Sequence, residues 1–596
     1  MQNKSTYIGS VQDVNGSCIK IIMSNESLFG LSYIDGQGYK IGQIGSFIKI
    51  PIGYIDLYGV ISQVGASAVP ERMLQIQPNG NRWITVQLIG EATRTGNFQR
   101  GVSQYPIIGD EAHVVTEKDL HVLYGLPDEP QYVQIGNIAS AEAIPALLDI
   151  DKFITRHSAI VGSTGSGKSN TVTSILKSIT CGKFPKAKII LIDPHSEYKN
   201  ALSSVAKIFS LDSTENPLSI PFWGLSYNEL ALILFDKKQA ADTQQDLAIQ
   251  DKILNDKLEI SSKLKLGALT KEDITINSPI PFNLKKIWYD LFVEEYATVN
   301  TKADLKTIAY KKDAAGNEIK GNYKNLIPPE FLPPGAGSSV PFKYKENRIL
   351  SSPLNKLHGK LKDTRLKFLF DTDEFDGITK DLNDLLDTWI NHDKPITVLD
   401  LGGVPFEIMD LVVGLICRIT FESMFWGRYI DGFGRKRPIL MVFEEAHSYL
   451  PRGGSNQFVV GYACNAVRRI CKEGRKYGIG ASIISQRPSE LDESILSQCG
   501  TFISLRLSNS NDQGIIKSSI PDSSFSLSEL LPSLRTGEAI IVGEAVKIPS
   551  RVMIPLMHPR PDSSDPIPSK EWNDTSIENP DFPKAINSWR KQITLK

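Results

Sequence analysis

The chain has 596 residues, 41% of them hydrophobic and 22% charged, which leaves room for several domains around a large buried core. Its 66 basic and 67 acidic residues nearly cancel, which excludes a uniformly basic coat for nucleic acid but not a basic channel inside an oligomer. The six cysteines show no CxxC spacing, which argues against structural zinc and a disulfide framework. No apolar run follows the first residues, so we expect no signal peptide and a reduced, cytoplasmic location.

Residues 1–120 alternate hydrophobic and polar side chains in short, glycine-punctuated runs, as in Ile19, Ile21 and Met23. This pattern is typical of strands, and we expect them to close into a small barrel because an open sheet leaves unpaired edges. A module for assembly or partner docking is favoured. A nucleic-acid-binding barrel is the alternative, but no cluster of basic and aromatic residues supports it. Residues 121–151 are predicted to be a linker.

A phosphate-binding P-loop follows a short apolar stretch, residues 158–161, and matches the pattern G-x-x-x-x-G-K-[ST]. Its glycines let successive backbone N–H groups point at phosphate oxygens, while Lys168 adds a positive charge and Ser169 a hydroxyl for Mg²⁺. Hydrophobic residues then recur at helical spacing from Val172 to Ile179. The predicted nucleotide-binding residues are Gly162, Ser163, Thr164, Gly165, Ser166, Gly167, Lys168, Ser169 and Asn170.

A second predicted strand, residues 188–192, ends in the polar sequence DPHSEY. Side chains at the carboxyl ends of parallel strands face the ligand of such a sheet, so Asp193, His195 and Glu197 are candidate nucleotide contacts. A capped turn is the alternative.

Residues 226–393 are predicted to form an insertion into the nucleotide domain. The runs 236–266 and 354–389 have helical spacing, and residues 311–339 are polar with Gly and Pro, which indicates a loop. The basic residues of the second run are interpreted as a solvated helix face, with contact to a phosphate backbone as the alternative.

The core is predicted to resume at residue 394. The apolar run 411–426 contains Arg418 and Glu422, so a buried core helix is favoured over a membrane span. Residues 439–443 form a continuous apolar run, typical of a central parallel strand buried on both faces. With further strands at 481–484, 501–505 and 539–542, the pattern predicts a doubly wound α/β domain of the RecA-like P-loop NTPase kind.

An acidic pair, Glu444-Glu445, ends the predicted central strand. Hydrolysis of ATP at a P-loop needs Mg²⁺ and a positioned water, so we assign Glu444 to the metal with Ser169, and Glu445 to the water. Gln486 ends the next strand and can sense the γ-phosphate or cap a turn. Arg475 and Arg156 are candidates for an arginine supplied to a neighbouring subunit, with ordinary salt bridges as the alternative.

Seven motifs in this order resemble those of the HerA family, hexameric DNA translocases related to FtsK: GSTGSGKSNT, IDPHSEY, ITVLDLGGVP, VFEEAH, EGRKYG, SQRP and TGEAIIVGEAVKIPSRV. The resemblance implies a homo-hexamer with ATP between subunits, Glu445 as catalytic glutamate, and Arg475 and Arg156 acting at the subunit boundary. It also implies that the barrel docks a partner, either a NurA-like or other nuclease or a sirtuin-like NADase, in DNA end processing or antiphage defence. Residues 557–596 resemble an arm that clasps a neighbouring protomer.

Two basic loops are candidates for DNA contact, Arg452 after the acidic pair and the run Arg435, Lys436, Arg437 before the central strand. Solvated loops are the alternative for both. The motif set favours an ATP-driven translocase for double-stranded DNA, without a membrane anchor. A nucleotide-gated ring that activates a defence effector without translocating is the alternative. The predicted parts are the barrel 1–120, linker 121–151, ATPase core 152–225 and 394–556, helical insertion 226–393 and C-terminal arm 557–596.

Overall fold

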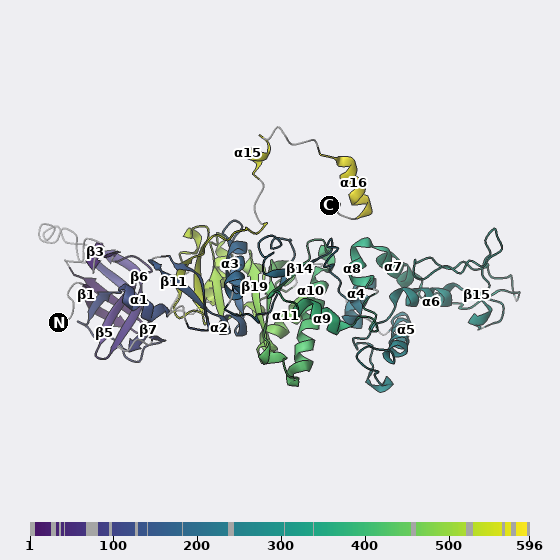
Figure 1. Cartoon of the computed structure of the whole chain (residues 1–596), viewed down its shortest axis with the longest axis horizontal. Coiled ribbons are helices and arrows are strands. Elements are labelled where there is room, and N and C mark those ends of the chain that lie inside the picture. The colour runs from purple at the N-terminus through teal and green to yellow at the C-terminus, as the bar shows by residue number, and fades with distance from the viewer. Residues whose placement is uncertain are drawn as a thin grey trace.

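In the computed structural model, a barrel, a large central sheet and a helical insertion follow one another along the long axis of the molecule (Figure 1). The structure describes residues 6–592 with the exception of 25–30, 35–36, 41, 67–81, 94–97, 126–128, 140, 182, 236–242, 303, 338, 373, 454–460, 520–528, 563–566 and 574–579. Among the helices in these ranges, none is long and apolar enough to cross a membrane.

The N-terminal strands close into an antiparallel barrel, which confirms the sequence prediction. The ring runs β2-β1-β9-β5-β6-β7, and β7 pairs back with β2, so no edge of the ring stays open. Side chains alternate between the interior and the outside along β7, as the two-residue period requires. The strands are β1 (Tyr7–Asn15), β2 (Cys18–Met23), β5 (Phe47–Ile52), β6 (Ile55–Ala66), β7 (Arg82–Thr93) and β9 (Glu111–Val114), with β8 (Phe98–Arg100) beside β7 and the hairpin β3 (Leu31–Ile34) and β4 (Gln37–Lys40).

Within the described residues, eleven strands form the central sheet, in the order β11-β10-β22-β21-β20-β12-β19-β18-β13-β17-β14. The strands from β20 to β14 run parallel, and the others are antiparallel to their neighbours. The bounds are β10 (Tyr132–Ile138), β11 (Ala141–Asp149), β12 (Ser158–Val161), β13 (Ile189–Asp193), β14 (Ala206–Ser210), β17 (Ile396–Asp400), β18 (Ile439–Phe443), β19 (Ile479–Ser485), β20 (Thr501–Ser504), β21 (Glu538–Gly543) and β22 (Ser550–Met553).

The stretch 121–151, expected to be a linker, is instead part of this sheet. β10 and β11 form a hairpin, and β10 pairs with β22, a strand about four hundred residues later in the chain. A pairing partner that distant leaves no local signal, which explains why the strands were not predicted. The α1 helix (Glu117–Tyr124) contacts β11 and joins the barrel to the sheet.

Helices cover both faces of the sheet, which confirms the predicted doubly wound α/β core. On β18, Leu440 and Val442 share a hydrophobic cluster with α3, whereas Met441 and Phe443 face α10 and α11 on the other side. All five β18 residues are buried, as predicted for a central strand. The helices of the core are α2 (Ile150–Thr155), α3 (Lys168–Thr180), α10 (Phe406–Trp426), α11 (Tyr462–Glu473), α12 (Glu493–Leu496) and α13 (Ser510–Ser519).

The insertion is helical, as predicted, and lies at the end of the molecule opposite the barrel (Figure 1). The second predicted run is broken into three helices rather than one, and Asp236 to Asp242 of the first run lie outside the described residues. Lys356 binds the Phe235 carbonyl and Arg365 pairs with Asp363, so these basic residues are engaged within the insertion. The elements are α4 (Tyr227–Phe235), α5 (Gln244–Ser261), α6 (Leu284–Tyr296), β15 (Thr298–Val299), β16 (Phe342–Lys343), α7 (Ser351–Lys362), α8 (Lys367–Phe370) and α9 (Leu382–Ile390).

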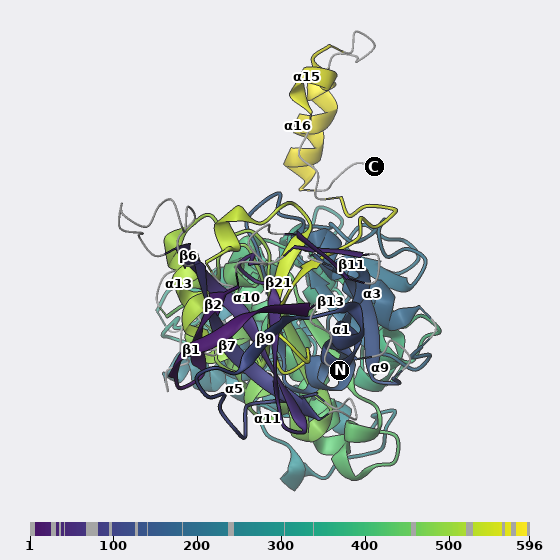
Figure 2. The same cartoon turned by 90° about the vertical axis from the view of Figure 1, so that its left-hand side faces the viewer.

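The end of the tail lies on the outside of the body in both views (Figures 1 and 2), and its Lys591 carbonyl accepts the Thr364 hydroxyl of the insertion at 3.4 Å. It contains α15 (Pro568–Glu571) and α16 (Phe582–Lys591), and Trp572 and Trp589 are 87% and 71% exposed. Aromatic side chains left this open are typical of a surface that another chain covers, so the clasping arm stays a prediction.

His157, between α2 and β12, makes the folding stability pH-dependent. It is 3% exposed, and its Nδ1 accepts the Ala481 N–H at 3.0 Å. Burial lowers the pKa of His157 from its ordinary value of 6.5 to about 4. Protonation of His157 therefore favours the unfolded chain. The contribution of neutral His157 to the free energy of unfolding is complete above pH 6.5 and is lost as the pH falls toward 4. The loss is about 1 kcal/mol at pH 5.5.

We expect His157→Asn to flatten this dependence, because the asparagine Oδ1 can accept the same N–H without titrating and asparagine tolerates the left-handed φ of 55° found there. Thermal unfolding at pH 7.5 and pH 5.5 measures the effect. An equal loss of stability in wild type and variant would assign the pH dependence to other groups.

Candidate functional site

The predicted P-loop lies between the end of β12 and the start of α3, where the chain turns tightly. Gly167 has a φ of 100°, a conformation that favours glycine, and a Cβ at this position would lie 3.1 Å from the Gly537 nitrogen. Gly537 donates its N–H to the Ser166 carbonyl at 2.9 Å, which holds the loop against the start of β21. The loop is therefore shaped by close backbone packing as well as by its own sequence.

The Lys168 side chain lies in the cavity above this loop and is only 6% exposed. Its ammonium hydrogen bonds to the Glu445 carboxylate and lies 3.4 Å from Glu444 Oε1. The two glutamates follow β18, which is separated from β12 by β19 alone. The parallel sheet thus brings the predicted lysine and acidic pair to one edge.

Glu445 is held as a carboxylate by three neighbours. Lys168 and Gln486 Nε2, the latter at 2.5 Å, hydrogen bond to Oε1, and His447 Nδ1 lies 3.2 Å from Oε2. Burial acts to raise the pKa of Glu445, but the Lys168 charge and these hydrogen bonds outweigh it and hold the pKa below its usual value. The residue also has a φ of 45°, a strained conformation for a non-glycine residue that is typical of functional sites.

Glu444 has a different environment from its neighbour. It is fully buried, and burial raises the pKa of its carboxyl group to about 7. Tyr198 donates its hydroxyl to Oε2 at 2.8 Å, whereas Oε1 accepts no hydrogen bond from the described residues. A buried carboxylate oxygen without a hydrogen-bond donor fits a cation ligand. The two adjacent carboxylates are therefore suited to different roles.

The strand β13 contributes a further carboxylate to the cavity. Glu197 Oε2 accepts the Ser169 hydroxyl at 2.7 Å, so it lies beside the residue assigned to Mg²⁺. Asp193 instead accepts the N–H groups of His195 and Tyr198, at 3.2 and 3.1 Å. The carboxylate of Asp193 thus forms the capped turn that was the alternative for this motif, and the turn positions Glu197 and Tyr198.

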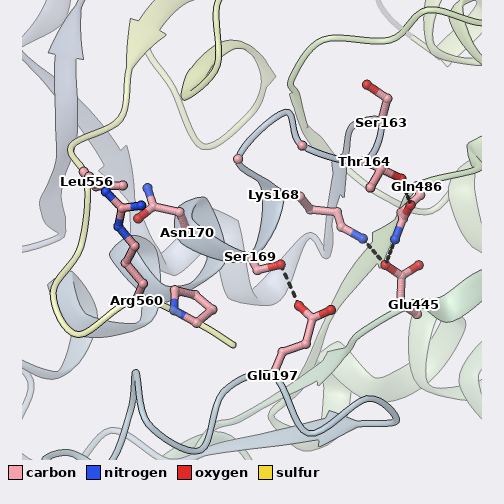
Figure 3. A pocket seen from close by; sticks show the side chains of 13 residues that line it. Ser163, Thr164, Lys168, Ser169, Asn170, Glu197, Glu445, Gln486, Leu556 and Arg560 are labelled. Atoms are coloured by element: carbon pink, nitrogen blue, oxygen red, sulfur yellow. Dashed lines mark hydrogen bonds and ion pairs between the residues drawn. The ribbon is translucent and has the colours of Figure 1, made fainter. Parts of the chain in front are cut away.

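The P-loop, Glu197, Glu445 and Gln486 line one cavity (Figure 3). Gln486 bridges two of its walls, since it also accepts the Thr164 hydroxyl at 2.5 Å. A third wall comes from the segment after β22, which the sequence motifs did not indicate. The lining residues are Ser163, Thr164, Gly165, Gly167, Lys168, Ser169, Asn170, Glu197, Glu445, Gln486, Leu556, Arg560 and Pro561.

Comparison with known proteins shows which family the chain resembles. The family model "Helicase HerA, central domain" matches residues 133–420. The DNA double-strand break repair helicase HerA of Sulfurisphaera tokodaii is 26% identical over 482 residues, covering 81% of this chain and 80% of the relative. The protein of the same name from Saccharolobus solfataricus is 28% identical over 474 residues, covering 78% of this chain and 76% of the relative. Over most of its length the chain is similar to the HerA family.

Among solved structures, two proteins resemble this chain at low identity. The bacterial conjugative coupling protein TrwB is 11% identical with a TM-score of 0.40, covering 75% of this chain and 93% of its own. VirB4 of Thermoanaerobacter pseudethanolicus is 15% identical with a TM-score of 0.40, covering 72% of this chain and 97% of its own.

The two candidate arginines lie at the amino ends of the parallel strands, opposite the P-loop. Arg156 precedes β12, and Arg475 lies in the short turn Gly474–Tyr477 before β19. The six residues from Arg156 to the P-loop span roughly 20 Å, more than an arginine side chain reaches. Arg156 Nε lies 3.4 Å from Glu544 Oε2, the ordinary salt bridge that was its alternative, whereas Arg475 is exposed.

The two predicted DNA loops lie at opposite edges as well. Arg435, Lys436 and Arg437 precede β18 on the same edge as Arg475, and Arg435 Nε donates to the Lys476 carbonyl at 3.3 Å. Arg452 lies beyond the carboxyl end of β18 and pairs with Glu493 at 2.5 Å. Gly454, the end of that loop, lies outside the described residues. The structure therefore does not bring the two loops together in one protomer.

Proposed function

We propose that this chain hydrolyses ATP and uses the energy to move double-stranded DNA through a ring of identical subunits. The observation that carries the ATPase is the hydrogen-bonded cluster of Lys168, Glu445 and Gln486, which come from the ends of three neighbouring strands. The DNA substrate rests on similarity to the HerA family, since these relatives are named DNA double-strand break repair helicases.

In this proposal, the contacts within the cluster change when ATP binds. The Lys168 ammonium, paired with two carboxylates in the structure, moves to the β- and γ-phosphate oxygens. Glu445 is then free to accept a hydrogen bond from the attacking water and to take its proton as the bond between the γ-phosphorus and the bridging oxygen breaks. Gln486, in contact with Glu445 and Thr164, links the water-binding side of the cavity to the phosphate loop.

The residues beside the P-loop fit a magnesium ion. Ser169, Glu197 and Glu444 supply oxygen ligands of the kind that Mg²⁺ prefers, and one buried oxygen of Glu444 lacks a hydrogen-bond donor among the described residues. A bound Mg²⁺ would neutralise charge on the phosphate oxygens.

The position of the arginines supports a hexamer in which each site lies between subunits. Arg475 and Arg156 lie too far along the sheet to reach the P-loop of their own chain, so either can serve only a neighbour's site. The basic residues Arg435, Lys436 and Arg437 lie on that same edge, where a ring axis could carry DNA.

The barrel is the part we propose for partner docking. It lies at one end of the molecule, and Tyr54, Ile107 and Ile108 are 87%, 71% and 71% exposed there. A NurA-like or other nuclease, or a sirtuin-like NADase, is the proposed class of partner, in DNA end processing or antiphage defence. These exposed apolar side chains also favour the second candidate function, a nucleotide-gated ring that activates the partner without moving DNA.

ATP turnover by the full chain, measured with and without linear duplex DNA, tests the proposal. We expect duplex DNA to stimulate turnover and the stimulation to weaken steeply as salt rises, because contacts to the DNA backbone are electrostatic. ATP turnover that is unchanged by duplex DNA at low salt would contradict the motor function. The nucleotide-gated ring would then be the favoured function.

A further inference from the structure

The segment 555–562, which follows β22, forms one wall of the nucleotide cavity. Leu556, Arg560 and Pro561 line the same cavity as Lys168 and Glu445, although they lie almost four hundred residues after the P-loop. The P-loop motif does not include such a wall, so it does not account for the role of these residues in the cavity.

Hydrogen bonds hold this segment against its own protomer on both sides of Arg560. The Asn170 side chain hydrogen bonds to the backbone of this segment at two positions. Both the side chain and the backbone N–H of Asp562 also form hydrogen bonds. The contacts are Asn170 Nδ2 to the Pro555 carbonyl at 2.9 Å, Met557 N to Asn170 Oδ1 at 2.8 Å, Lys177 Nζ to the His558 carbonyl at 3.2 Å, Asp562 N to the Glu197 carbonyl at 2.8 Å, and Asn200 Nδ2 to Asp562 Oδ2 at 2.7 Å. Arg560 is therefore presented to the cavity by a fixed backbone.

The position of Arg560 indicates which part of a nucleotide it meets. In Figure 3, Lys168 and Glu445 lie on one side of Ser169, and Arg560, Leu556 and Asn170 lie on the other. The lysine of a P-loop reaches the β- and γ-phosphates, so the opposite side of the cavity faces the nucleoside.

Resting on the ATPase function proposed above, we propose that the 555–562 segment binds the base of the nucleotide and that the Arg560 guanidinium stacks on the base. The guanidinium is planar and stacks on aromatic faces, which a lysine ammonium cannot do in the same way. Leu556 and Pro561 supply apolar contact beside it, and Pro561 is itself buried, which makes the wall rigid.

Binding and steady-state kinetics of the full-length Arg560→Ala variant test this assignment. We expect Kd for ATP and ADP and KM for ATP to rise roughly tenfold, with kcat unchanged within about twofold, because the base is bound equally before and during hydrolysis. Binding of inorganic tripolyphosphate, which has no base, should not change. Arg348→Ala removes an exposed arginine of the insertion outside the cavity and is the matched control, expected to behave as wild type.

Arg560→Lys distinguishes a base contact from a phosphate contact. If Arg560 stacks on the base, lysine should not restore ATP affinity. Weakened tripolyphosphate binding in Arg560→Ala together with rescue by lysine would overturn the assignment in favour of a phosphate contact, and unchanged ATP affinity would overturn it outright. Wild-type chain that neither binds nor hydrolyses ATP would contradict the ATPase itself, whereas normal wild-type turnover with no effect of Arg560→Ala contradicts the base contact alone.

Discussion

Lys168→Ala should abolish ATP turnover, lowering kcat/KM by at least roughly a thousandfold, and this is the largest effect that we expect of any substitution in the chain. The ammonium is the only cation in direct contact with Glu444 and Glu445 among the described residues, so its loss leaves that side of the cavity without a cation for the β- and γ-phosphates. Turnover by the purified full chain, with release of inorganic phosphate as the readout, measures the loss.

The same substitution should also lower stability. Without Lys168, two adjacent buried carboxylates lose their shared cation, a change that typically costs about 3 kcal/mol. Adding Glu445→Gln to Lys168→Ala removes one of the two negative charges and should recover part of the thermal stability without recovering turnover. A Lys168→Ala variant that keeps turnover within tenfold of wild type would contradict the assignment of the site.

Glu445→Gln should bind ATP but hydrolyse it at least roughly a hundredfold more slowly than wild type. Glutamine has the same shape, so the side chain can keep its contact with Gln486, but an amide cannot take a proton from water. Equilibrium binding and phosphate release, measured on the same preparation, separate these two effects. Turnover close to that of wild type would mean that another group positions the water.

Glu444→Gln is the matched control for this prediction, because it changes the neighbouring carboxylate of the same strand end. We expect it to raise the Mg²⁺ concentration needed for turnover, which Glu445→Gln should not do. Glu445→Gln also separates the two candidate functions. If the variant ring, which binds ATP without hydrolysing it, still activates the proposed partner, the scaffold function is favoured. If it cannot activate the partner, the scaffold function alone is not enough.

The core of the fold could be predicted because its signals are local. The run 439–443 is apolar without interruption, and the structure places it at the centre of the parallel sheet, buried on both faces. The P-loop, the strand before it and the helix after it were predictable for the same reason. Since parallel strands share a carboxyl edge, the meeting of Lys168 with the acidic pair followed from the predicted topology.

The parts that could not be predicted depend on contacts between distant segments. β10 and β11 were expected to be a linker because their partner β22 lies far along the chain. Arg560 had no motif around it, and its place in the cavity follows from the path of the chain after β22. Tyr198 and His447 lay within quoted motifs, but no spacing indicated that they would contact Glu444 and Glu445.

The most direct test of the proposed motor is displacement of a third strand from a duplex–triplex substrate by the full chain, with its partner present. The account predicts displacement that needs ATP and is absent with Lys168→Ala and with Glu445→Gln, because both variants lack turnover. Displacement that proceeds equally with Glu445→Gln, or no displacement by a wild-type chain that hydrolyses ATP, would contradict it.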